Sequence, residues 1–294
     1  MKTILLTGAT GFLGSHLTKA LFKKNKIIIL KRSFSDTQRI QEILNQIQSY
    51  DIDKISLTQI FNENPIHIVI HTATNYGRET STLTDVLEAN LLFPIRILEC
   101  CLKTHVKTFI NTDTALPRDM NPYSLAKKQF LEWLKFYGDP MQIINMKLEY
   151  FYGLTEDNKK FVTRIIQKML RNEDVDLTAG DQKRDFIYIS DIVCAYSTMI
   201  EQLSKIPSPY FEIEVGSGSS VTIKKFVEKI KNISKSTSLL KFGALPYRRN
   251  EVMESTADIL PMLKLGWKPT IGLEEGLQKM IAHEKDLLCQ KPKN

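Results

Sequence analysis

The chain begins MKTILLTGATGFLGSHLTKAL, residues 1–21 of 294. The short apolar run Ile4–Leu6 has the composition of a buried strand, and it leads directly into Gly8, Gly11 and Gly14. A helical pattern then continues from Gly14 to Lys23. A strand that ends in closely spaced glycines and opens a helix is typical of a loop that binds the phosphates of a dinucleotide.

Each glycine of this loop has a physical role. Gly8 permits the tight turn, Gly11 removes a Cβ where the pyrophosphate approaches, and Gly14 lets the helix pack on the strand. The helix N-terminus directs N–H groups and partial positive charge toward the phosphates. The cofactor-binding residues expected in this loop are Gly8, Thr10, Gly11, Phe12, Leu13 and Gly14. Taken alone, the glycines also fit a strand–helix turn without a ligand.

Short apolar runs alternate with longer amphipathic segments in the first half of the chain. The expected strands are Ile4–Thr7, Lys26–Leu30, His67–Thr72, Thr108–Asn111 and Gln142–Lys147. The expected helices are Gly14–Lys23, Asp36–Gln48, Leu83–Lys103 and Asn121–Tyr137. Repeated strand–helix units predict an α/β fold of the Rossmann type, a doubly wound parallel sheet with right-handed crossovers.

The sequence after Gly153 is more irregular and predicts a smaller α/β C-terminal lobe. Helices are expected at Phe161–Leu170, Ile189–Leu203, Thr222–Ile233 and Leu273–Leu288, with a short strand and turn at Asp174–Gly180 and a strand at Tyr210–Val215. We expect residues 1–150 to form the dinucleotide-binding domain, with a returning segment near 185–215. Residues 151–184 and 216–294 are then expected to form the lobe.

Composition narrows the class of protein. The net charge of +7 comes from scattered lysines without an arginine–aromatic stripe, so nucleic acid is not an expected partner. The four cysteines lack metal-ligand spacing, so no metal is expected. No run approaches the 18 or so apolar residues of a membrane span, and the first apolar run is too short for a secretory signal. A cytoplasmic protein is expected.

The second expected strand decides the type of cofactor. It ends Leu30-Lys31-Arg32-Ser33, without the carboxylate that favours NAD at the ribose 2′-hydroxyl. A guanidinium matches the geometry of a 2′-phosphate, so Lys31, Arg32 and Ser33 favour NADPH over NADH. The alternative is an ordinary solvated arginine at a strand end. Asp51 and Asp53 are both candidates to accept from the adenine amino group.

A reactive pair is expected on the helix that follows Asn121. Tyr123 and Lys127 are four residues apart and share one face of this helix. A tyrosine with the usual pKa of about 10 is a weak acid–base group near neutral pH, and a neighbouring ammonium lowers that pKa. The preceding strand ends with the hydroxyls of Thr112 and Thr114, which can hold a substrate oxygen during proton transfer. A plain amphipathic helix is the alternative for the pair alone.

In combination, these motifs resemble the extended short-chain dehydrogenase/reductase family of NAD-dependent epimerases and dehydratases. The resemblance covers nearly the whole chain. It rests on TGATGFLG, His71-Thr72-Ala73-Thr74, Asn90, Tyr123-x-x-x-Lys127, Tyr152-Gly153, GDQKRDFIY at residues 180–188 and LGWKP at residues 265–269. The resemblance implies a nucleotide-sugar substrate, bound by the C-terminal lobe.

The resemblance also implies roles for individual residues. Tyr123, Lys127 and Thr114 are the expected catalytic residues, with Thr112 as the alternative hydroxyl if the alignment shifts by two. The cofactor site extends to Ala73, Thr74, Asn90, Thr112, Tyr123 and Lys127. The expected substrate-binding residues are Tyr76, Thr114, Glu149, Arg184 and Arg248, of which the two arginines hold the diphosphate.

Within the family, several segments look most like nucleotide-sugar 4-ketoreductases of the CDP-abequose synthase type. These segments include residues 73–77, 111–114, 148–149, 181–186 and 242–244. The likeness implies NADPH-dependent reduction of the C4 keto group of a 4-keto-6-deoxy or 3,6-dideoxy hexose, in deoxysugar synthesis for lipopolysaccharide O-antigen or another surface polysaccharide. A dTDP-4-keto-6-deoxyglucose reductase that makes dTDP-fucose and a nucleotide-sugar 4-epimerase remain alternatives.

Other features bear on this interpretation. Ala115 and Leu116 follow Thr114 where a 4,6-dehydratase of the family has an acidic pair, which argues against dehydration. Lys147-Leu148-Glu149-Tyr150 replaces the usual Arg-x-x-Asn of the family, so sugar and pyrophosphate contacts there differ. A non-catalytic NADP-binding protein on the same fold is a further alternative. By resemblance, residues 83–103 and 121–137 form a four-helix bundle with a second subunit, so a homodimer is expected.

Overall fold

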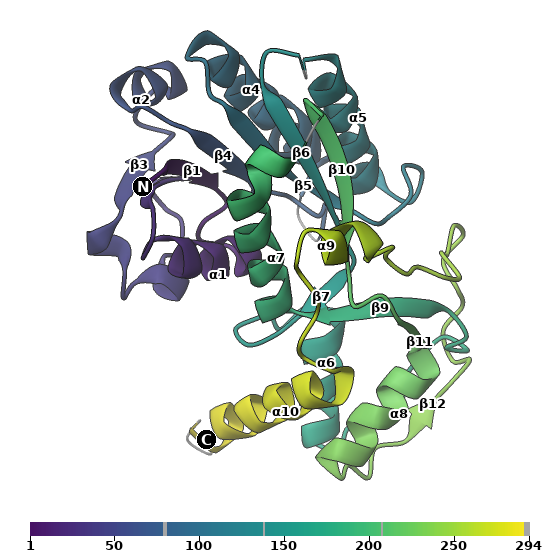
Figure 1. Cartoon of the computed structure of the whole chain (residues 1–294). Coiled ribbons are helices and arrows are strands. Elements are labelled where there is room, and N and C mark those ends of the chain that lie inside the picture. The colour runs from purple at the N-terminus through teal and green to yellow at the C-terminus, as the bar shows by residue number, and fades with distance from the viewer. Residues whose placement is uncertain (79–80, 138, 207, 291–294) are drawn as a thin grey trace. The chain divides into compact units, whose positions relative to one another are not determined.

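A computed structural model describes residues 1–78, 81–137, 139–206 and 208–290 of the chain. Within these ranges, the central sheet has seven strands in the order β10-β6-β5-β4-β1-β2-β3 (Figure 1). The strands are β1 Thr3–Thr7, β2 Lys26–Lys31, β3 Gln48–Asp51, β4 Ile68–His71, β5 Thr108–Thr114, β6 Gln142–Leu148 and β10 Tyr210–Val215. The predicted Rossmann-type parallel sheet is confirmed.

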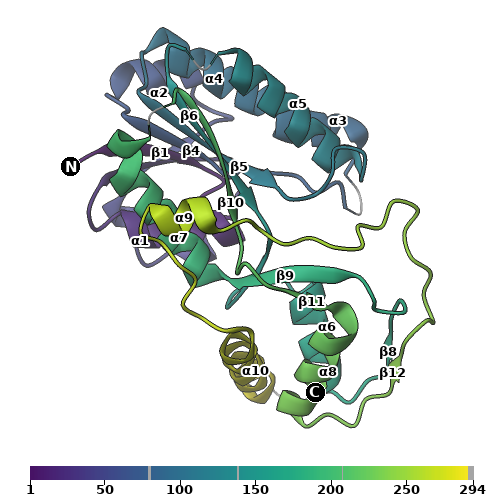
Figure 2. The same cartoon turned by 45° about the vertical axis from the view of Figure 1, so that its right-hand side comes forward.

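Helices cover both faces of this sheet. They are α1 Phe12–Leu21, α2 Leu57–Glu63, α3 Leu83–Leu87, α4 Phe93–Lys103 and α5 Pro122–Phe136, with a π-helical turn at Glu88–Leu92 between α3 and α4. Figure 2 shows α3, α4 and α5 in one layer over one face, and α1 on the opposite face. Between α4, α5 and the sheet lies an apolar core that includes Leu5, Val69, Ile97, Cys101, Phe109, Phe130, Leu134 and Ile143.

The helix predicted at Asp36–Gln48 is wrong. The segment forms 3-10 turns at Gln38–Ile40 and Leu44–Gln46 and then enters β3, which the sequence pattern did not indicate. Ile40 and Ile43 are the residues of this segment that the fold buries. Their spacing of three matches the three residues per turn of a 3-10 helix.

By its internal contacts, the described chain divides into two compact units. The first unit contains Met1–Leu148 and Tyr196–Glu214, and the second contains Glu149–Ala195 and the chain from Val215 onward. Helix α7, Ile189–Gln202, begins in the second unit and ends in the first. The domain functions expected from the sequence remain predictions.

The second unit has its own small sheet, in the order β11-β9-β7. Its elements are β7 Tyr150–Tyr152, α6 Phe161–Leu170, β8 Val175–Asp176, β9 Lys183–Tyr188, β11 Ser220–Thr222, α8 Ile223–Ser234, β12 Leu240–Lys241, α9 Leu260–Lys264 and α10 Leu273–Gln290. Phe186 of β9 stacks on Phe226 of α8, with ring centroids 3.8 Å apart, and Trp267 is buried. In neither unit is a described helix both long and apolar enough to cross a bilayer.

Candidate active site

The glycine loop after β1 is a tight turn with little room for side chains. Gly8 has φ +71°, in the left-handed region that favours glycine, and a Cβ there would lie 2.6 Å from the backbone nitrogen of Ala73. A Cβ on Gly14 would lie 2.1 Å from the carbonyl oxygen of Gly8. Both glycines are therefore required by the close approach of β1, α1 and the segment after β4.

Helix α1 begins directly at this turn. Gly11 is its extended N-cap residue, and none of the described side chains caps the helix by a hydrogen bond. Phe12 and Leu13 are buried at its first turn, and Thr10 is half-buried beside them. An N-terminus without a side-chain cap has backbone donors and partial positive charge suited to an anion, so the turn fits a dinucleotide pyrophosphate.

Two carboxylates from outside β2 lie beside its carboxyl end. Lys31 forms an ion pair with Asp51, which lies opposite it in the parallel register of β3. The N–H and hydroxyl of Ser33 donate to Asp53, at 2.7 and 2.5 Å, and these hydrogen bonds lower the pKa of Asp53. Arg32 is exposed, and its guanidinium stacks over Phe34. The sequence of β2 contains neither carboxylate, because Asp51 ends β3 and Asp53 follows it. The expected contact of either residue with the adenine amino group remains a prediction.

The segment after β4 is held by a buried asparagine. Asn90 accepts from the Thr74 hydroxyl at 2.7 Å and from the N–H of Asn75, and its amide donates to the Asn75 carbonyl. The N–H of Ala73 donates to the Thr7 hydroxyl. The hydrogen bonds of Asn90 therefore fix the backbone that the sequence assigns to the cofactor, and its role as a direct cofactor contact remains a prediction.

Tyr123 lies at the start of α5, where Asn121 forms a capping box with Ser124. The hydroxyls of Thr114 and Thr74 lie beside its phenol, and its ring packs 5.0 Å from that of Tyr76 between centroids. Burial raises the pKa of Tyr123 well above 10, and the two threonine hydroxyls oppose this shift. Tyr123 is therefore a protonated phenol at neutral pH, held at the carboxyl end of β5.

Lys127 follows Tyr123 by four residues and is buried at 2% exposure. Burial lowers the pKa of its ammonium to about 8, and the negative charge of Asp113 opposes that shift. The lysine is thus charged near neutral pH but close to its titration. A buried tyrosine and a lysine with a perturbed pKa on one helix face are typical of a catalytic site.

The two candidate threonines of β5 have different partners. The hydroxyl of Thr114 lies beside the phenol of Tyr123 and accepts from the N–H of Leu116 at 3.2 Å. The hydroxyl of Thr112 instead lies 2.6 Å from the phenol oxygen of Tyr196 on α7. The first unit therefore brings Thr74, Tyr76, Thr114 and Tyr123 together and separates the Thr112 hydroxyl from them.

The remaining predicted substrate residues belong to the second unit. Arg184 is buried, donates to Glu251 and stacks over the ring of Tyr150, whereas Arg248 is exposed in the turn that precedes Glu251. Glu149 is buried, and the Ser255 hydroxyl donates to its carboxylate, with the hydroxyl oxygen 2.7 and 2.9 Å from the two carboxylate oxygens. These assignments remain predictions.

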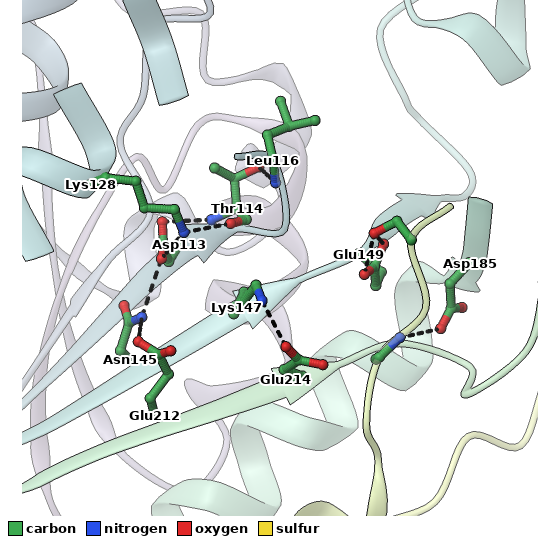
Figure 3. Close-up of polar contacts among 12 residues, drawn as sticks. Asp113, Thr114, Leu116, Lys128, Asn145, Lys147, Glu149, Asp185, Glu212 and Glu214 are labelled. Carbon is green, nitrogen blue, oxygen red and sulfur yellow. Dashed lines mark hydrogen bonds and ion pairs between the residues drawn. The ribbon is translucent and has the colours of Figure 1, made fainter. Parts of the chain in front are cut away.

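Sequence reasoning missed Asp113 and Lys128. Asp113 is buried beside Thr114, and Lys128 Nζ lies 2.6 Å from its carboxylate (Figure 3). A carboxylate between the two threonines at the end of β5, and a second lysine next to Lys127, were the available signals. Among the described residues, no group of His, Cys, Asp and Glu side chains is arranged to hold a metal ion.

Comparison with known proteins places this geometry in a family. Residues 4–216 match the model of the NAD dependent epimerase/dehydratase family. The chain is 35% identical to a CDP-abequose synthase of Salmonella muenchen over 291 residues, which cover 96% of this chain and 97% of the relative. It is 26% identical to a dTDP-4-dehydro-6-deoxyglucose reductase of Escherichia coli, with 98% of each chain covered.

Solved structures agree with the sequence comparisons. A UDP-glucuronic acid 4-epimerase from Bacillus cereus, in complex with UDP-glucuronic acid and NAD, superposes with a TM-score of 0.85 at 25% identity. The superposition covers 97% of this chain and 99% of the epimerase. The resemblance to nucleotide-sugar 4-ketoreductases expected from the motifs is confirmed. This chain matches one family model over most of its length and a curated relative over nearly all of it. It therefore belongs to the NAD dependent epimerase/dehydratase family.

Proposed function

We propose that this protein is an NADPH-dependent reductase of the C4 keto group of a nucleotide-linked 4-keto-6-deoxy or 3,6-dideoxy hexose. The observation that carries the proposal is the buried phenol of Tyr123, beside the hydroxyl of Thr114 at the end of β5 and on the same helix as the buried ammonium of Lys127. The 35% identity to a CDP-abequose synthase over nearly the whole chain supports this substrate class.

In this mechanism Thr114 and Tyr123 bind the C4 oxygen of the sugar. A bound reduced nicotinamide supplies hydride to C4. As negative charge develops on the oxygen, Tyr123 donates its proton, and the hydroxyl of Thr114 stabilises the same oxygen by a hydrogen bond. The positive charge of Lys127 stabilises the phenolate that remains. The raised pKa of Tyr123 suits this role, because the residue enters the reaction protonated.

Dehydration is the chemistry that the site supports least. A 4,6-dehydratase needs a free acid–base pair beside its threonine, and Thr114 is followed by Ala115 and Leu116. The neighbouring carboxylate of Asp113 is buried and already bonded to Lys128. That carboxylate is therefore not free to transfer protons to a sugar.

A nucleotide-sugar 4-epimerase is the second candidate. The similar epimerase from Bacillus cereus holds NAD, and Asp51 and Asp53 are bonded to Lys31 and Ser33 beside the end of β2, where a carboxylate favours NAD. NADPH is favoured by Arg32, the exposed cation at the same strand end. An epimerase returns its cofactor unchanged, whereas a reductase consumes it.

The nucleotide base is a separate question. We propose a CDP-linked sugar, since the relative with 35% identity is a CDP-abequose synthase, and a dTDP-linked sugar is the alternative, since the reductase of Escherichia coli is also similar. Arg184 and Arg248 are proposed to bind the diphosphate, with Tyr76 and Glu149 as further substrate contacts. The reaction belongs to the synthesis of deoxysugars for lipopolysaccharide O-antigen or another surface polysaccharide, and a cytoplasmic location is proposed with it.

The experiment is incubation of the purified protein with NADPH or NADH and a panel of 4-keto sugar nucleotides. The panel contains CDP- and dTDP-linked 4-keto-6-deoxy and CDP-linked 4-keto-3,6-dideoxy hexoses. We expect stoichiometric loss of NADPH absorbance and a C4 hydroxyl in the NMR spectrum of the product. Binding of NADPH without its consumption on any member of the panel would instead indicate a non-catalytic NADP-binding protein.

We also propose a homodimer through the layer of α3, α4 and α5. This layer exposes apolar side chains that one monomer leaves uncovered: Leu83, Leu87, Leu92, Leu125, Trp133 and Phe136. Trp133 and Phe136 are 47% and 79% exposed, and they lie on the outer side of α5. Several large exposed apolar side chains on one layer of helices are typical of a protein interface.

Sedimentation velocity tests the dimer. Trp133→Glu combined with Phe136→Glu is expected to convert a dimer into a monomer. Leu239→Glu is the control, because this leucine is also exposed but lies in the second unit, just before β12. A wild-type monomer at micromolar concentration contradicts the proposal.

A further inference from the structure

The two residues of one ion pair hydrogen-bond with the backbone of Thr114, one with its N–H and the other with its carbonyl. Its N–H donates to Oδ1 of Asp113 at 2.8 Å, and its carbonyl accepts from Nζ of Lys128 at 2.9 Å (Figure 3). The same Nζ donates to Oδ2 of Asp113 at 2.6 Å, which closes the ring. The three residues thus form one bonded unit that links the end of β5 to α5.

Thr114 needs such support because it stands at the last position of the strand. Its neighbour Ala115 makes one more ladder hydrogen bond, to the carbonyl of Leu148, and the chain then leaves the sheet. Strand ends have fewer ladder bonds than strand interiors and open more easily. The bonds to Asp113 and Lys128 compensate for this at the residue whose hydroxyl meets Tyr123.

A second row of amides holds the carboxylate in place. Asn145 of β6 donates to Oδ2 of Asp113 at 3.2 Å and to Glu212 of β10 at 2.9 Å. Asn111 donates to the Asn145 oxygen at 2.7 Å, which fixes the orientation of that amide. Both oxygens of Asp113 therefore have partners, and the carboxylate cannot rotate without breaking several bonds.

Burial makes this ion pair sensitive to change. The Asp113 side chain is fully buried and that of Lys128 is 18% exposed. A buried charge left without its partner is far more disruptive than a surface one. Because the carboxylate of Asp113 is buried and bonded to Lys128, the role of this ion pair is to hold the neighbouring backbone in place.

We propose that the Asp113–Lys128 ion pair positions Thr114, fixing where its hydroxyl meets the substrate oxygen and Tyr123. The inference rests on the proposed reductase function. It assigns the position of the catalytic threonine to two residues that do not touch the substrate. Asp113 and Lys128 are positioning residues that act through Thr114, and their two charges have opposite effects on the pKa of Lys127. Displacement of a catalytic group by about 1 Å is enough to lower a rate by about 100-fold.

The first test is kinetic. In Lys128→Met the Thr114 carbonyl loses its donor, and we expect kcat to fall 10- to 100-fold while the dissociation constant of NADPH changes less than twofold. Glu132→Gln is the matched control. Glu132 also lies on α5 and forms an ion pair, with Arg118, and no described hydrogen bond or ion pair joins it to Asp113 or Thr114. We expect the control to keep its kcat.

A neutral pair separates geometry from buried charge. Asp113→Asn with Lys128→Met leaves no unpaired charge, and the asparagine oxygen can still accept from the Thr114 N–H, but the carbonyl stays without a donor. We expect this double variant to have the kcat of Lys128→Met, because the two residues act as one unit. It also replaces Lys128→Met if that variant does not fold. Recovery of wild-type kcat in the double variant overturns the proposal.

The second test does not need a substrate. In protein labelled with ¹³C at threonine methyl groups, the signal of Thr114 is assigned from its loss in Thr114→Ser. We expect this signal to shift or broaden in Lys128→Met and to stay unchanged in Glu132→Gln. An unchanged Thr114 signal in Lys128→Met overturns the positioning role, even if wild-type protein reduces no keto sugar. Failure of every keto sugar with wild-type protein, by contrast, overturns the proposed function.

Discussion

The hydroxyl of Thr112 lies 2.6 Å from the phenol of Tyr196, so two threonines separated by one residue have different partners. The hydroxyl of Thr114 instead lies beside the phenol of Tyr123. Thr114→Val is therefore expected to lower kcat by about 10- to 100-fold through loss of a hydrogen bond to the reacting oxygen. Thr112→Val removes a bond inside the fold and is expected to lower the free energy of unfolding by about 1 kcal/mol. Steady-state kinetics and urea unfolding distinguish the two, and the reverse pattern would assign catalysis to Thr112.

Tyr123→Phe tests the proton donor. Without the phenol oxygen the alkoxide has no positioned acid, and kcat is expected to fall by at least about 100-fold. NADPH affinity, measured by fluorescence quenching, is expected to change less than threefold because the ring remains. Equal loss of NADPH binding and turnover would mean that Tyr123 holds the fold of the site rather than the proton.

The charge of Lys127 predicts a pH dependence. Burial lowers its pKa to about 8, so its ammonium is present below that pH and is lost as the pH rises through it. Because the phenolate of Tyr123 needs this charge, kcat is expected to fall above about pH 8. The pH profile of kcat between 6.5 and 9.5 checks this, and a profile that is flat to pH 9.5 contradicts it.

Cofactor choice is expected to depend on Arg32 and Asp53. Arg32→Ala removes the exposed cation at the end of β2 and is expected to raise the KM for NADPH by about 10-fold or more, the effect of one charge-assisted hydrogen bond. The KM for NADH is expected to change little. Asp53→Asn removes a carboxylate that holds Ser33, so the KM for NADPH is expected to fall. A larger effect of Arg32→Ala on NADH would contradict NADPH as the cofactor.

Glu156 predicts a change in stability with pH. Burial raises the pKa of this carboxyl to about 7, although Lys160 and the hydroxyl of Thr163 oppose the shift. The unfolded chain ionises Glu156 near pH 4.5, so stability is lost as the pH rises from there to about 7. Glu156→Gln keeps an acceptor for Thr163 and avoids the buried charge. At pH 8 its free energy of unfolding is expected to exceed that of wild type by about 2 kcal/mol.

Thermal melts at pH 5 and pH 8 check this prediction. The two proteins are expected to melt close together at pH 5, where the carboxyl is largely protonated in the folded state. At pH 8 the Glu156→Gln variant is expected to melt several degrees higher. A variant that melts lower at pH 8 would show that the ionised carboxylate and Lys160 form a stabilising pair.

The sheet was predictable because each of its early strands is a short apolar run before a helical pattern. Phe161–Leu170 and Tyr210–Val215 have the bounds that their patterns predicted. Strand β3 was not predictable from its residues, QSYD at 48–51, because none is strongly apolar and β3 is an edge strand with little burial. Strand β9 was not predicted because its first three residues, Lys183, Arg184 and Asp185, are charged, and the apolar run that follows them is only three residues long.

The site was predictable where spacing along one element decides the geometry. The placement of Tyr123 and Lys127 on one helix face follows from a separation of four residues. The partners that come from other elements were not predictable. Asp53 lies 20 residues from Ser33, and Lys128 lies 15 residues from Asp113, so only the register of neighbouring strands and the packing of α5 bring them together.

The central claim is hydride transfer to C4 of a keto sugar with Tyr123 as the proton donor. Its most direct test uses NADPH deuterated at the transferred position, a CDP-linked 4-keto-3,6-dideoxy hexose and the wild-type protein, with NMR and mass spectrometry of the product. The account predicts one deuterium at C4 for each NADPH consumed and almost none with Tyr123→Phe. No deuterium at C4 and no loss of NADPH with this keto sugar, together with inversion of C4 in a nucleotide sugar that carries a C4 hydroxyl, would contradict it and indicate an epimerase.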